Sequence, residues 1–324
     1  MRQYEDVWYR GFDGTKLYAR HYAGSNSCNK SCSNSKMTVL CLHGLTRNSA
    51  DFETLVENLP DDYSVIIPDQ RGRGNSDWAD PCTYNPLCYV KDMWHLLKAL
   101  KEKKIAVIGT SMGGMMAMLM VLEKPKFVQG VVLNDVGPEV NRDGINKIAA
   151  YVGQDQIAMT WQEAAEFCQS RHGAVFPNYS KEDWEVFARR LYKESDFGKI
   201  TLNYDPAIAE VVKKDAAVDE FPNLWPLFST MKYLPLLVVR GESSDILSES
   251  CFDKMLETNQ HSVKVGLTVK SRGHAPSLEE PEVVAGINEF LARTESAKTL
   301  TREKIRRATF PVVMKIATAL KKAG

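Results

Sequence analysis

The sequence predicts an α/β fold, with a mostly parallel eight-stranded sheet, helices on both faces and a helical segment inserted into the sheet domain. Two observations predict this class. Short apolar runs alternate with longer helical stretches, which is typical of parallel strands joined by crossover helices. Between Pro138 and Lys232 the strand-like runs stop and helical patterning takes over, after which strands resume. At 324 residues and 44% hydrophobic content, the chain can bury a core of this size.

The first two strands form a predicted hairpin. Val7–Arg10 and Lys16–Ala23 alternate apolar and polar residues on either side of Asp13-Gly14, a turn sequence that joins antiparallel strands. Short apolar runs predict six further strands, at Thr38–Leu42, Tyr63–Pro68, Lys104–Ile108, Val128–Asn134, Leu234–Arg240 and Val263–Val269. The expected helices of the sheet domain are Ser49–Asn58, Pro86–Leu100, Met112–Glu123 and Pro281–Leu291.

The expected domain organisation follows from this pattern. Residues 1–137 and 233–293 form the sheet domain, and residues 138–232 form a helical cap inserted after the sixth strand. Within the cap, Thr160-Trp-Gln-Glu163 has the spacing of a capping box, which predicts that a helix begins there. Residues 294–324 remain as a C-terminal tail.

Charge is distributed unevenly along the chain. Lys+Arg and Asp+Glu number 41 each, which argues against a nucleic-acid partner. From Arg293 to Gly324, nine Lys/Arg stand against two Asp/Glu, which leaves 32 against 39 in the rest of the chain. The tail is amphipathic, with apolar residues at helical spacing opposite a basic face. We expect it to dock on the acidic body or to fray, and membrane contact through residues 295–324 is the less favoured alternative.

The cysteines and the N-terminus favour a cytoplasmic protein. Seven cysteines, an odd number scattered along the chain, are typical of reduced thiols. The segment from Met1 to Asp6 lacks an apolar signal core, and no stretch approaches about 18 uninterrupted apolar residues. Cys28 and Cys32 lie in a Ser/Asn-rich loop without a second pair of ligands, so we expect no metal site there.

The segment Gly109-Thr-Ser-Met-Gly113 predicts a nucleophile. It ends an apolar strand and passes directly into a Met/Ala/Leu-rich helical stretch, so Ser111 is expected on a sharp strand-to-helix turn with its hydroxyl exposed. Gly109 and Gly113 omit the side chains that would collide in such a turn. The helix that begins at Met112 would point its N-terminal dipole at a developing oxyanion.

An activated serine needs a base and an acid that orients the base. His274 is the preferred base because it follows the last predicted strand, at the edge of the sheet where Ser111 also emerges. Asp245 is the preferred acid because it follows strand Leu234–Arg240 and gives the chain order Ser, Asp, His. Asp135, which ends the neighbouring strand, is the alternative acid. Glu242 is a weaker rival, expected to act as a cap or surface charge.

The expected oxyanion hole uses the backbone amides of Met112 and Leu45. Gly44 would let the chain turn so that the Leu45 amide points inward, and His43 would support this loop. The segment Asp69-Gln-Arg-Gly-Arg-Gly-Asn-Ser76 mixes glycine with arginine, but it lacks a third spaced glycine and a following helix. A phosphate-binding loop is therefore rejected, and its Arg71 and Arg73 are expected to brace loops.

On these residues the chain resembles the α/β-hydrolase fold family from about Tyr4 to Arg293. His43-Gly44, the Asp69–Ser76 loop, Gly109–Gly113 and Arg272-Gly-His-Ala-Pro resemble four loops of that family. Within it the pattern is similar to bacterial-type esterases and to carbon–carbon hydrolases of ring-cleavage products, which also have a serine and a helical cap. Dehalogenases and epoxide hydrolases of this fold place aspartate at the position of Ser111.

The resemblance implies a serine hydrolase that cleaves a small to medium, mainly apolar ester through an acyl-enzyme, without metal or organic cofactor. A carbon–carbon hydrolase acting on a vinylogous diketone and a ligand receptor with little turnover are the alternatives. About a quarter of the cap aromatics are expected to face a ligand, the rest being cap core. These aromatics are Trp161, Phe167, Phe176, Trp184, Phe187, Tyr192, Trp225 and Phe228. Arg171, Arg189 and Arg190 could receive a carboxylate, although solvated surface is the preferred interpretation.

Overall fold

A computed structural model describes residues 2–25, 37–139, 141–153, 160–217 and 222–297. The eight strands of its main sheet follow the predicted ones within two residues, and their order across the sheet is β1-β2-β4-β3-β5-β6-β9-β10. They are β1 (Glu5–Arg10), β2 (Lys16–Tyr22), β3 (Thr38–Leu42), β4 (Val65–Asp69), β5 (Ile105–Thr110), β6 (Val128–Asn134), β9 (Leu236–Gly241) and β10 (Lys264–Val269). The β1–β2 and β2–β4 pairs are antiparallel and all other pairs are parallel, so the predicted fold class is confirmed.

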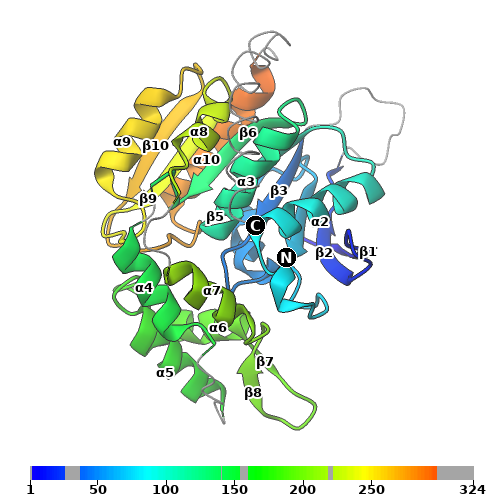
Figure 1. Cartoon of the computed structure of the whole chain (residues 1–324), viewed down its shortest axis with the longest axis vertical. Helices are drawn as coiled ribbons and strands as arrows, with labels where there is room; N and C mark the ends of the chain where they lie inside the picture. The colour runs from blue at the N-terminus through cyan, green and yellow to red at the C-terminus, as the bar shows by residue number, and fades with distance from the viewer. Residues whose placement is uncertain (1, 26–36, 140, 154–159, 218–221, 298–324) are drawn as a thin grey trace.

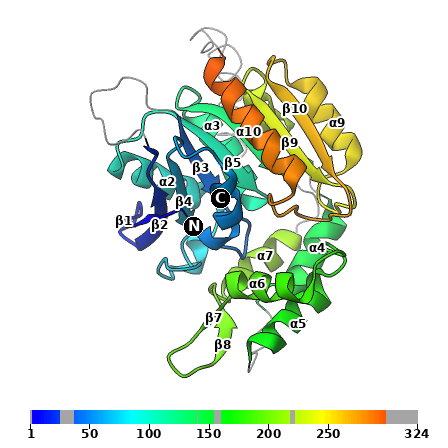
Figure 2. The same ribbon diagram turned by 180° about the vertical axis from the view of Figure 1, so that it is seen from behind.

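Helices cover both faces of the sheet (Figures 1 and 2). Apolar side chains of α2 (Pro86–Ala99), α3 (Met112–Glu123), α8 (Trp225–Phe228) and α9 (Glu249–Thr258) share one core cluster. Those of α1 (Glu53–Asn58), which follows the 3-10 turn Ser49–Phe52, and α10 (Pro281–Ser296) share the other. Along β5, Ile105 and Val107 belong to the first cluster and Ala106 and Ile108 to the second, because successive side chains of a strand point to opposite faces.

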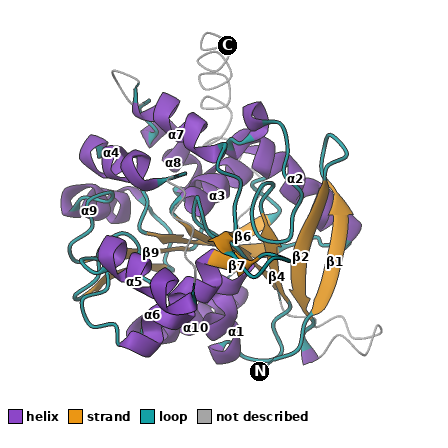
Figure 3. Ribbon diagram, turned by 90° about the horizontal axis from the view of Figure 1, so that it is seen from below, coloured by secondary structure: helices purple, strands orange, loops and turns teal. Residues whose placement is uncertain are grey.

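Most of the chain between β6 and β9 lies in a separate layer at the carboxyl ends of the strands. It contains α4 (Arg142–Tyr151), α5 (Trp161–His172), α6 (Lys181–Leu191) and α7 (Ile208–Ala216). Seen from this end, these helices spread over the strand ends, with β1 and β2 to one side (Figure 3). The capping box at Thr160 and Glu163 is present at the start of α5, as predicted.

Two features differ from the sequence-based expectations. The inserted segment is not all helical, because β7 (Tyr192–Glu194) and β8 (Ile200–Leu202) form an antiparallel hairpin in it. The helix α9 was not anticipated, although Ser248 caps it and Cys251, Phe252 and Met255 bury its inner face. Short 3-10 turns also occur at Pro81–Thr83 and Ser229–Met231.

Several sequence features lie outside the described residues. They are the Cys28/Cys32 pair and, apart from its first few residues, the basic tail. In the described part of the chain, no helix combines the length and the apolar character that crossing a membrane requires.

Candidate active site

Ser111 lies on a sharp turn between β5 and α3. Its backbone has φ 51° and ψ −113°, a conformation that L-residues adopt rarely, and it is the N-cap of α3. Two close approaches make the turn possible. A Cβ on Gly113 would lie 2.0 Å from the Leu42 carbonyl oxygen, and one on Gly109 would lie 2.4 Å from the Gly113 carbonyl oxygen. Both positions therefore require glycine, as the sequence predicts.

His274 lies beside Ser111, in the loop after β10. Its Nε2 is 2.9 Å from Ser111 Oγ, a hydrogen bond that joins residues 163 positions apart. Asn134, the last residue of β6, holds this loop in place: its amide nitrogen donates to the Pro276 carbonyl and to Thr110 Oγ1. The structure thus brings together the two residues that the sequence singled out first.

The carboxylate beside His274 belongs to Asp135, not to Asp245. Asp135 Oδ2 is 2.8 Å from His274 Nδ1, and the side chain is fully buried at the end of β6. Asp245 lies four residues beyond the end of β9. Its carboxylate pairs with Lys147 of α4 at 2.8 Å and is 37% exposed. The expectation that Asp245 lies beside His274 is therefore wrong, and the alternative acid, Asp135, lies there instead.

The loop after β9 reaches Asp135 through a different residue, Ser244. Its hydroxyl donates to Asp135 Oδ2 at 2.6 Å, while the Gly241 amide donates to Oδ1 at 3.0 Å. Sequence reasoning missed Ser244, although its neighbour Asp245 placed this loop near the site. Glu242 accepts from the Ser271 amide on the surface, in agreement with the cap or surface-charge role expected of it.

The segment 42–45, at the end of β3 and in the loop after it, also lies next to Ser111. Leu45 lines the cavity beside Ser111, while Met112 opens α3, so its amide is one of those that a helix cannot pair internally. Among the described residues, neither amide donates to a backbone carbonyl. Gly44 does not need to be glycine for space, because a Cβ there would meet its nearest atom at 3.6 Å.

His43 and Arg73 support this loop. His43 is fully buried; its Nε2 accepts from the Gln70 amide at 3.0 Å and its Nδ1 lies 2.7 Å from the Gly44 carbonyl. Nδ1 must therefore carry the proton. Burial lowers the pKa of His43 to about 4, so the ring is neutral. Arg73 donates to the Leu45 carbonyl at 2.8 Å, and Arg71 pairs with Asp92 and Asp13, so both arginines brace loops as expected.

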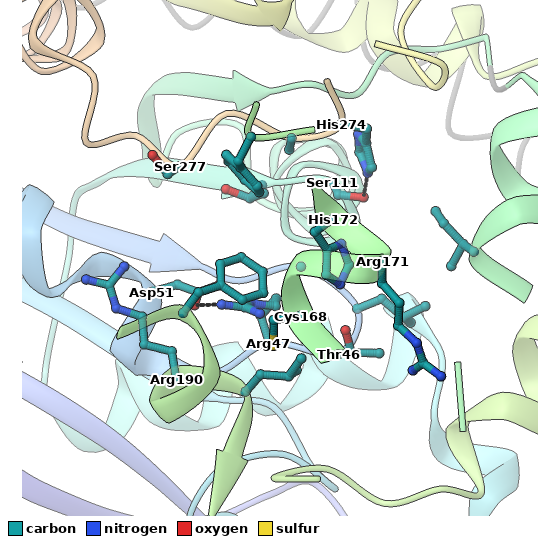
Figure 4. Close-up of a pocket in the computed structure, with 18 of the residues that line it drawn as sticks. Thr46, Arg47, Asp51, Ser111, Cys168, Arg171, His172, Arg190, His274 and Ser277 are labelled. Carbon is teal, nitrogen blue, oxygen red and sulfur yellow. Dashed lines mark hydrogen bonds and ion pairs between the residues drawn. The ribbon is translucent and has the colours of Figure 1, made fainter. Parts of the chain in front are cut away.

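A cavity of about 150 Å³ lies between Ser111 and the inserted segment (Figure 4). Four of the eight predicted cap aromatics line it, namely Phe167, Phe176, Phe187 and Tyr192. This is twice the expected share. The tyrosines Tyr151, Tyr179 and Tyr204 also line the cavity and were not singled out from the sequence. Trp184 is buried in packing, as expected for cap core, whereas Phe228 is buried in α8, which packs against α3 of the sheet domain.

The lining is more polar than the sequence suggested. Arg47, Arg171 and Arg190 all contribute to it, together with His172. Figure 4 shows Ser111 and His274 on one side of the cavity and these arginines on the other. The His172 ring meets Tyr151 edge-on and Phe187 at a tilt. Its burial, reinforced by the charges of Arg47 and Arg171, lowers its pKa to about 4, so it is neutral at pH 7.

A hydroxyl bonded to an imidazole whose other nitrogen faces a buried carboxylate is an arrangement that can activate a nucleophile. It is built entirely from protein side chains. Within the residues that the structure describes, no three His, Cys, Asp or Glu side chains are grouped so as to hold a metal ion.

Comparisons with known proteins agree with this fold. Residues 38–249 match the model of the alpha/beta hydrolase fold family. A 3-hydroxybutyrate-oligomer hydrolase of Cupriavidus necator is 34% identical over 78% of this chain and 87% of its own. A 2-(acetamidomethylene)succinate hydrolase of Mesorhizobium japonicum is 27% identical over 67% of this chain and 74% of its own.

A solved structure extends the likeness over nearly the whole described chain. An alpha/beta hydrolase from Novosphingobium aromaticivorans is 40% identical and superimposes with a TM-score of 0.82, covering 90% of this chain and 99% of that one. The family model alone spans well over half of the 324 residues. The chain therefore belongs to the α/β-hydrolase fold family.

Proposed function

We propose that this protein is a serine hydrolase that cleaves short carboxylic esters through an acyl-enzyme, with Ser111 as nucleophile, His274 as general base and Asp135 as the orienting acid. The observation that carries this proposal is the pair of hydrogen bonds, 2.9 Å and 2.8 Å, that links the three side chains in series. A 3-hydroxybutyrate-oligomer hydrolase and an esterase of Mycobacterium tuberculosis among the similar proteins support it.

The geometry implies a sequence of proton transfers. Ser111 Oγ attacks the ester carbonyl carbon while its proton passes to His274 Nε2, and the buried carboxylate of Asp135 stabilises the imidazolium that forms. The imidazolium then gives this proton to the departing alcohol, which leaves an acyl group on Ser111 Oγ. A water molecule, deprotonated by His274, releases the acid and restores Ser111.

The negative charge on the carbonyl oxygen would be held by the amides of Leu45 and Met112. Both belong to segments next to Ser111, and neither has a backbone acceptor among the described residues, so both can donate to a ligand. The Leu45 amide shares its peptide with the Gly44 carbonyl, and the 2.7 Å hydrogen bond from His43 Nδ1 to that carbonyl fixes this peptide before the substrate arrives. Such preorganisation is the main source of stabilisation for a developing oxyanion.

The test compares two aspartate variants on a p-nitrophenyl ester. We expect Asp135→Asn to lower kcat by about 10³- to 10⁴-fold, because the amide favours the wrong imidazole tautomer. The matched control Asp245→Asn should stay within about twofold, since it removes only an exposed ion pair with Lys147. Normal turnover in Asp135→Asn would overturn the assigned acid.

A serine probe separates an enzyme from a binding protein on the same fold. We expect a fluorophosphonate to label the wild type and not Ser111→Ala, and ester turnover to fall by about 10⁴-fold or more in that variant. Failure of the wild type to label would favour a ligand receptor. Labelling without turnover of any ester would favour carbon–carbon cleavage, and vinylogous diketones would then be assayed.

A further inference from the structure

Two of the three arginines that line the cavity are neutralised by acidic partners. Arg47 donates two hydrogen bonds to Asp51, at 2.8 and 2.7 Å, and its guanidinium lies over the Phe187 ring. Arg190 pairs with Glu279 at 2.6 Å and also donates to Thr54 Oγ1. These contacts link the inserted segment to the sheet domain. They also account for the positions of Arg47 and Arg190 without a bound ligand.

Arg171 is the exception. It lies in the last turn of α5, lines the same cavity as Ser111, and has no hydrogen bond or ion pair with any described residue. Its charge nevertheless acts on groups that line the cavity. It adds to the lowering of the pKa of His172, and it partly offsets the rise that burial causes in the pKa of Tyr192. Arg171 is partly buried, and a guanidinium at a cavity wall that no described residue pairs keeps its donors available for a ligand.

The neighbours of Arg171 suit an anion. Tyr151 and Tyr192 line the same cavity, and among the described residues neither hydroxyl has a hydrogen-bond partner. His172 is neutral, so it does not supply a competing charge. With Arg47 matched by Asp51 and Arg190 by Glu279, the described residues that line the cavity carry one positive charge in excess. One excess charge matches a monoanion, and a guanidinium binds a carboxylate through two parallel hydrogen bonds.

We propose that Arg171 binds a carboxylate group of the substrate, so that the ester cleaved at Ser111 carries an ionised acid at one end. This inference rests on the proposed ester hydrolysis and adds a substrate class to it. Arg189, which the sequence offered as an equal candidate, lies over the Trp161 ring at 4.5 Å, outside the cavity lining. It is therefore the matched control.

The test uses two pairs of esters, each differing in one carboxylate. In the first pair, the p-nitrophenyl hemiester of adipic acid is compared with p-nitrophenyl hexanoate, so that the acid lies on the acyl side. In the second, 3-butyryloxybutyrate is compared with its methyl ester, so that the acid lies on the alcohol side. The quantity measured is the ratio of kcat/KM for the acidic ester to that for the neutral ester.

We expect Arg171→Met to lower this ratio by about 10- to 100-fold in at least one pair, the loss typical of a charge-assisted hydrogen-bonded pair. Arg171→Lys should lower the ratio less, because lysine keeps the positive charge but cannot donate two parallel hydrogen bonds to the carboxylate. Arg189→Met should leave the ratio within about twofold of the wild type. Activity on the neutral esters should survive in all three variants, which shows that they fold.

A ratio unchanged by Arg171→Met in both pairs would overturn the proposal while leaving ester hydrolysis intact. If the wild type cleaves no ester of either pair, the proposed function fails instead, and binding decides the inference. Calorimetric titration of monomethyl adipate into Ser111→Ala, with and without Arg171→Met, then provides the readout. Weaker binding by at least about tenfold in the double variant supports the carboxylate site, and equal binding overturns it.

Discussion

At the scale of single residues, Ser244 links the loop after β9 to the proposed acid. Its oxygen accepts from the Ile246 and Leu247 amides, so the hydroxyl proton is directed at Asp135 Oδ2. Ser244 is thus a positioning residue, which acts on His274 through Asp135. Without it, the buried carboxylate loses one of its hydrogen-bond donors and is held less firmly under the imidazole.

We therefore expect Ser244→Ala to lower kcat by about 3- to 30-fold with little change in KM. This loss corresponds to part of the free energy of one hydrogen bond to a charged group. Ser244→Thr should restore much of the loss, because it keeps the hydroxyl. The control is Ser243→Ala, whose hydroxyl donates to the Arg272 carbonyl and does not face Asp135. Steady-state kinetics of the three variants check this, and a Ser244→Ala enzyme with normal kcat would contradict it.

His43 predicts a pH dependence of stability. Its pKa is about 4 in the folded chain and about 6.5 when unfolded. As pH falls below 6.5, the unfolded state takes up a proton that the folded state refuses, so stability is lost until the pH reaches about 4. Between pH 7 and pH 5 this group alone should lower the free energy of unfolding by about 2 kcal/mol.

Urea unfolding at the two pH values checks this for wild type, His43→Gln and His95→Gln. The difference between pH 7 and pH 5 should shrink by about 2 kcal/mol in His43→Gln, because glutamine does not titrate. His95 is an exposed residue of α2, so its replacement should leave that difference as it is. An equal pH dependence in all three proteins would mean that His43 is protonated when folded.

At the scale of elements, the contact between α3 and β3 sets how closely the Ser111 turn can pack. The Gly113 position lies against the Leu42 carbonyl, and backbone cannot move aside as a side chain can. We expect Gly113→Ala to lower the free energy of unfolding by about 2 kcal/mol or more, the cost of overpacking a rigid contact. Gly44→Ala, where a Cβ meets only ordinary contacts, should change it by less than about 0.5 kcal/mol. Denaturant unfolding of both variants measures the contrast, and equal losses would disprove it.

The elements that the sequence predicts best are those with strong local signals. The strands β3, β5 and β6 are uninterrupted apolar runs, and α3 follows a turn that only glycines permit, so their bounds are predicted within two residues. The hairpin β7–β8 has three residues in each strand, too few for a period-two pattern to appear. The helix α9 buries only a narrow stripe, and its cap at Ser248 was the signal available to find it.

At the scale of the whole molecule, the site depends on which strands are neighbours. Ser111 and His274 could be predicted because each follows a strand within a few residues, at the same edge of the sheet. The choice between Asp135 and Asp245 could not, because both follow strands that end at this edge and both give the same chain order. It depends on β6 lying between β5 and β9, and on the path of the loop after Gly241, which places Asp245 against Lys147. Periodicity and spacing carry no information about that path.

The cavity between the two layers also sets the size of the substrate. Its volume of about 150 Å³ is below the range of about 300–1,000 Å³ that is typical of sites for larger ligands. We therefore expect kcat/KM to be at least about tenfold higher for p-nitrophenyl butyrate than for the decanoate. Phe167 of α5 closes part of the cavity, whereas Trp161 of the same helix does not line it.

Phe167→Ala should therefore raise the relative rate on the decanoate by about tenfold, because removing the ring lengthens the space available to the acyl chain. Trp161→Ala provides the control, since it removes an aromatic side chain from the same helix without opening the cavity. A chain-length series from acetate to decanoate on the three proteins measures the effect. An identical profile for wild type and Phe167→Ala would mean that the acyl group does not enter the part of the cavity that Phe167 lines.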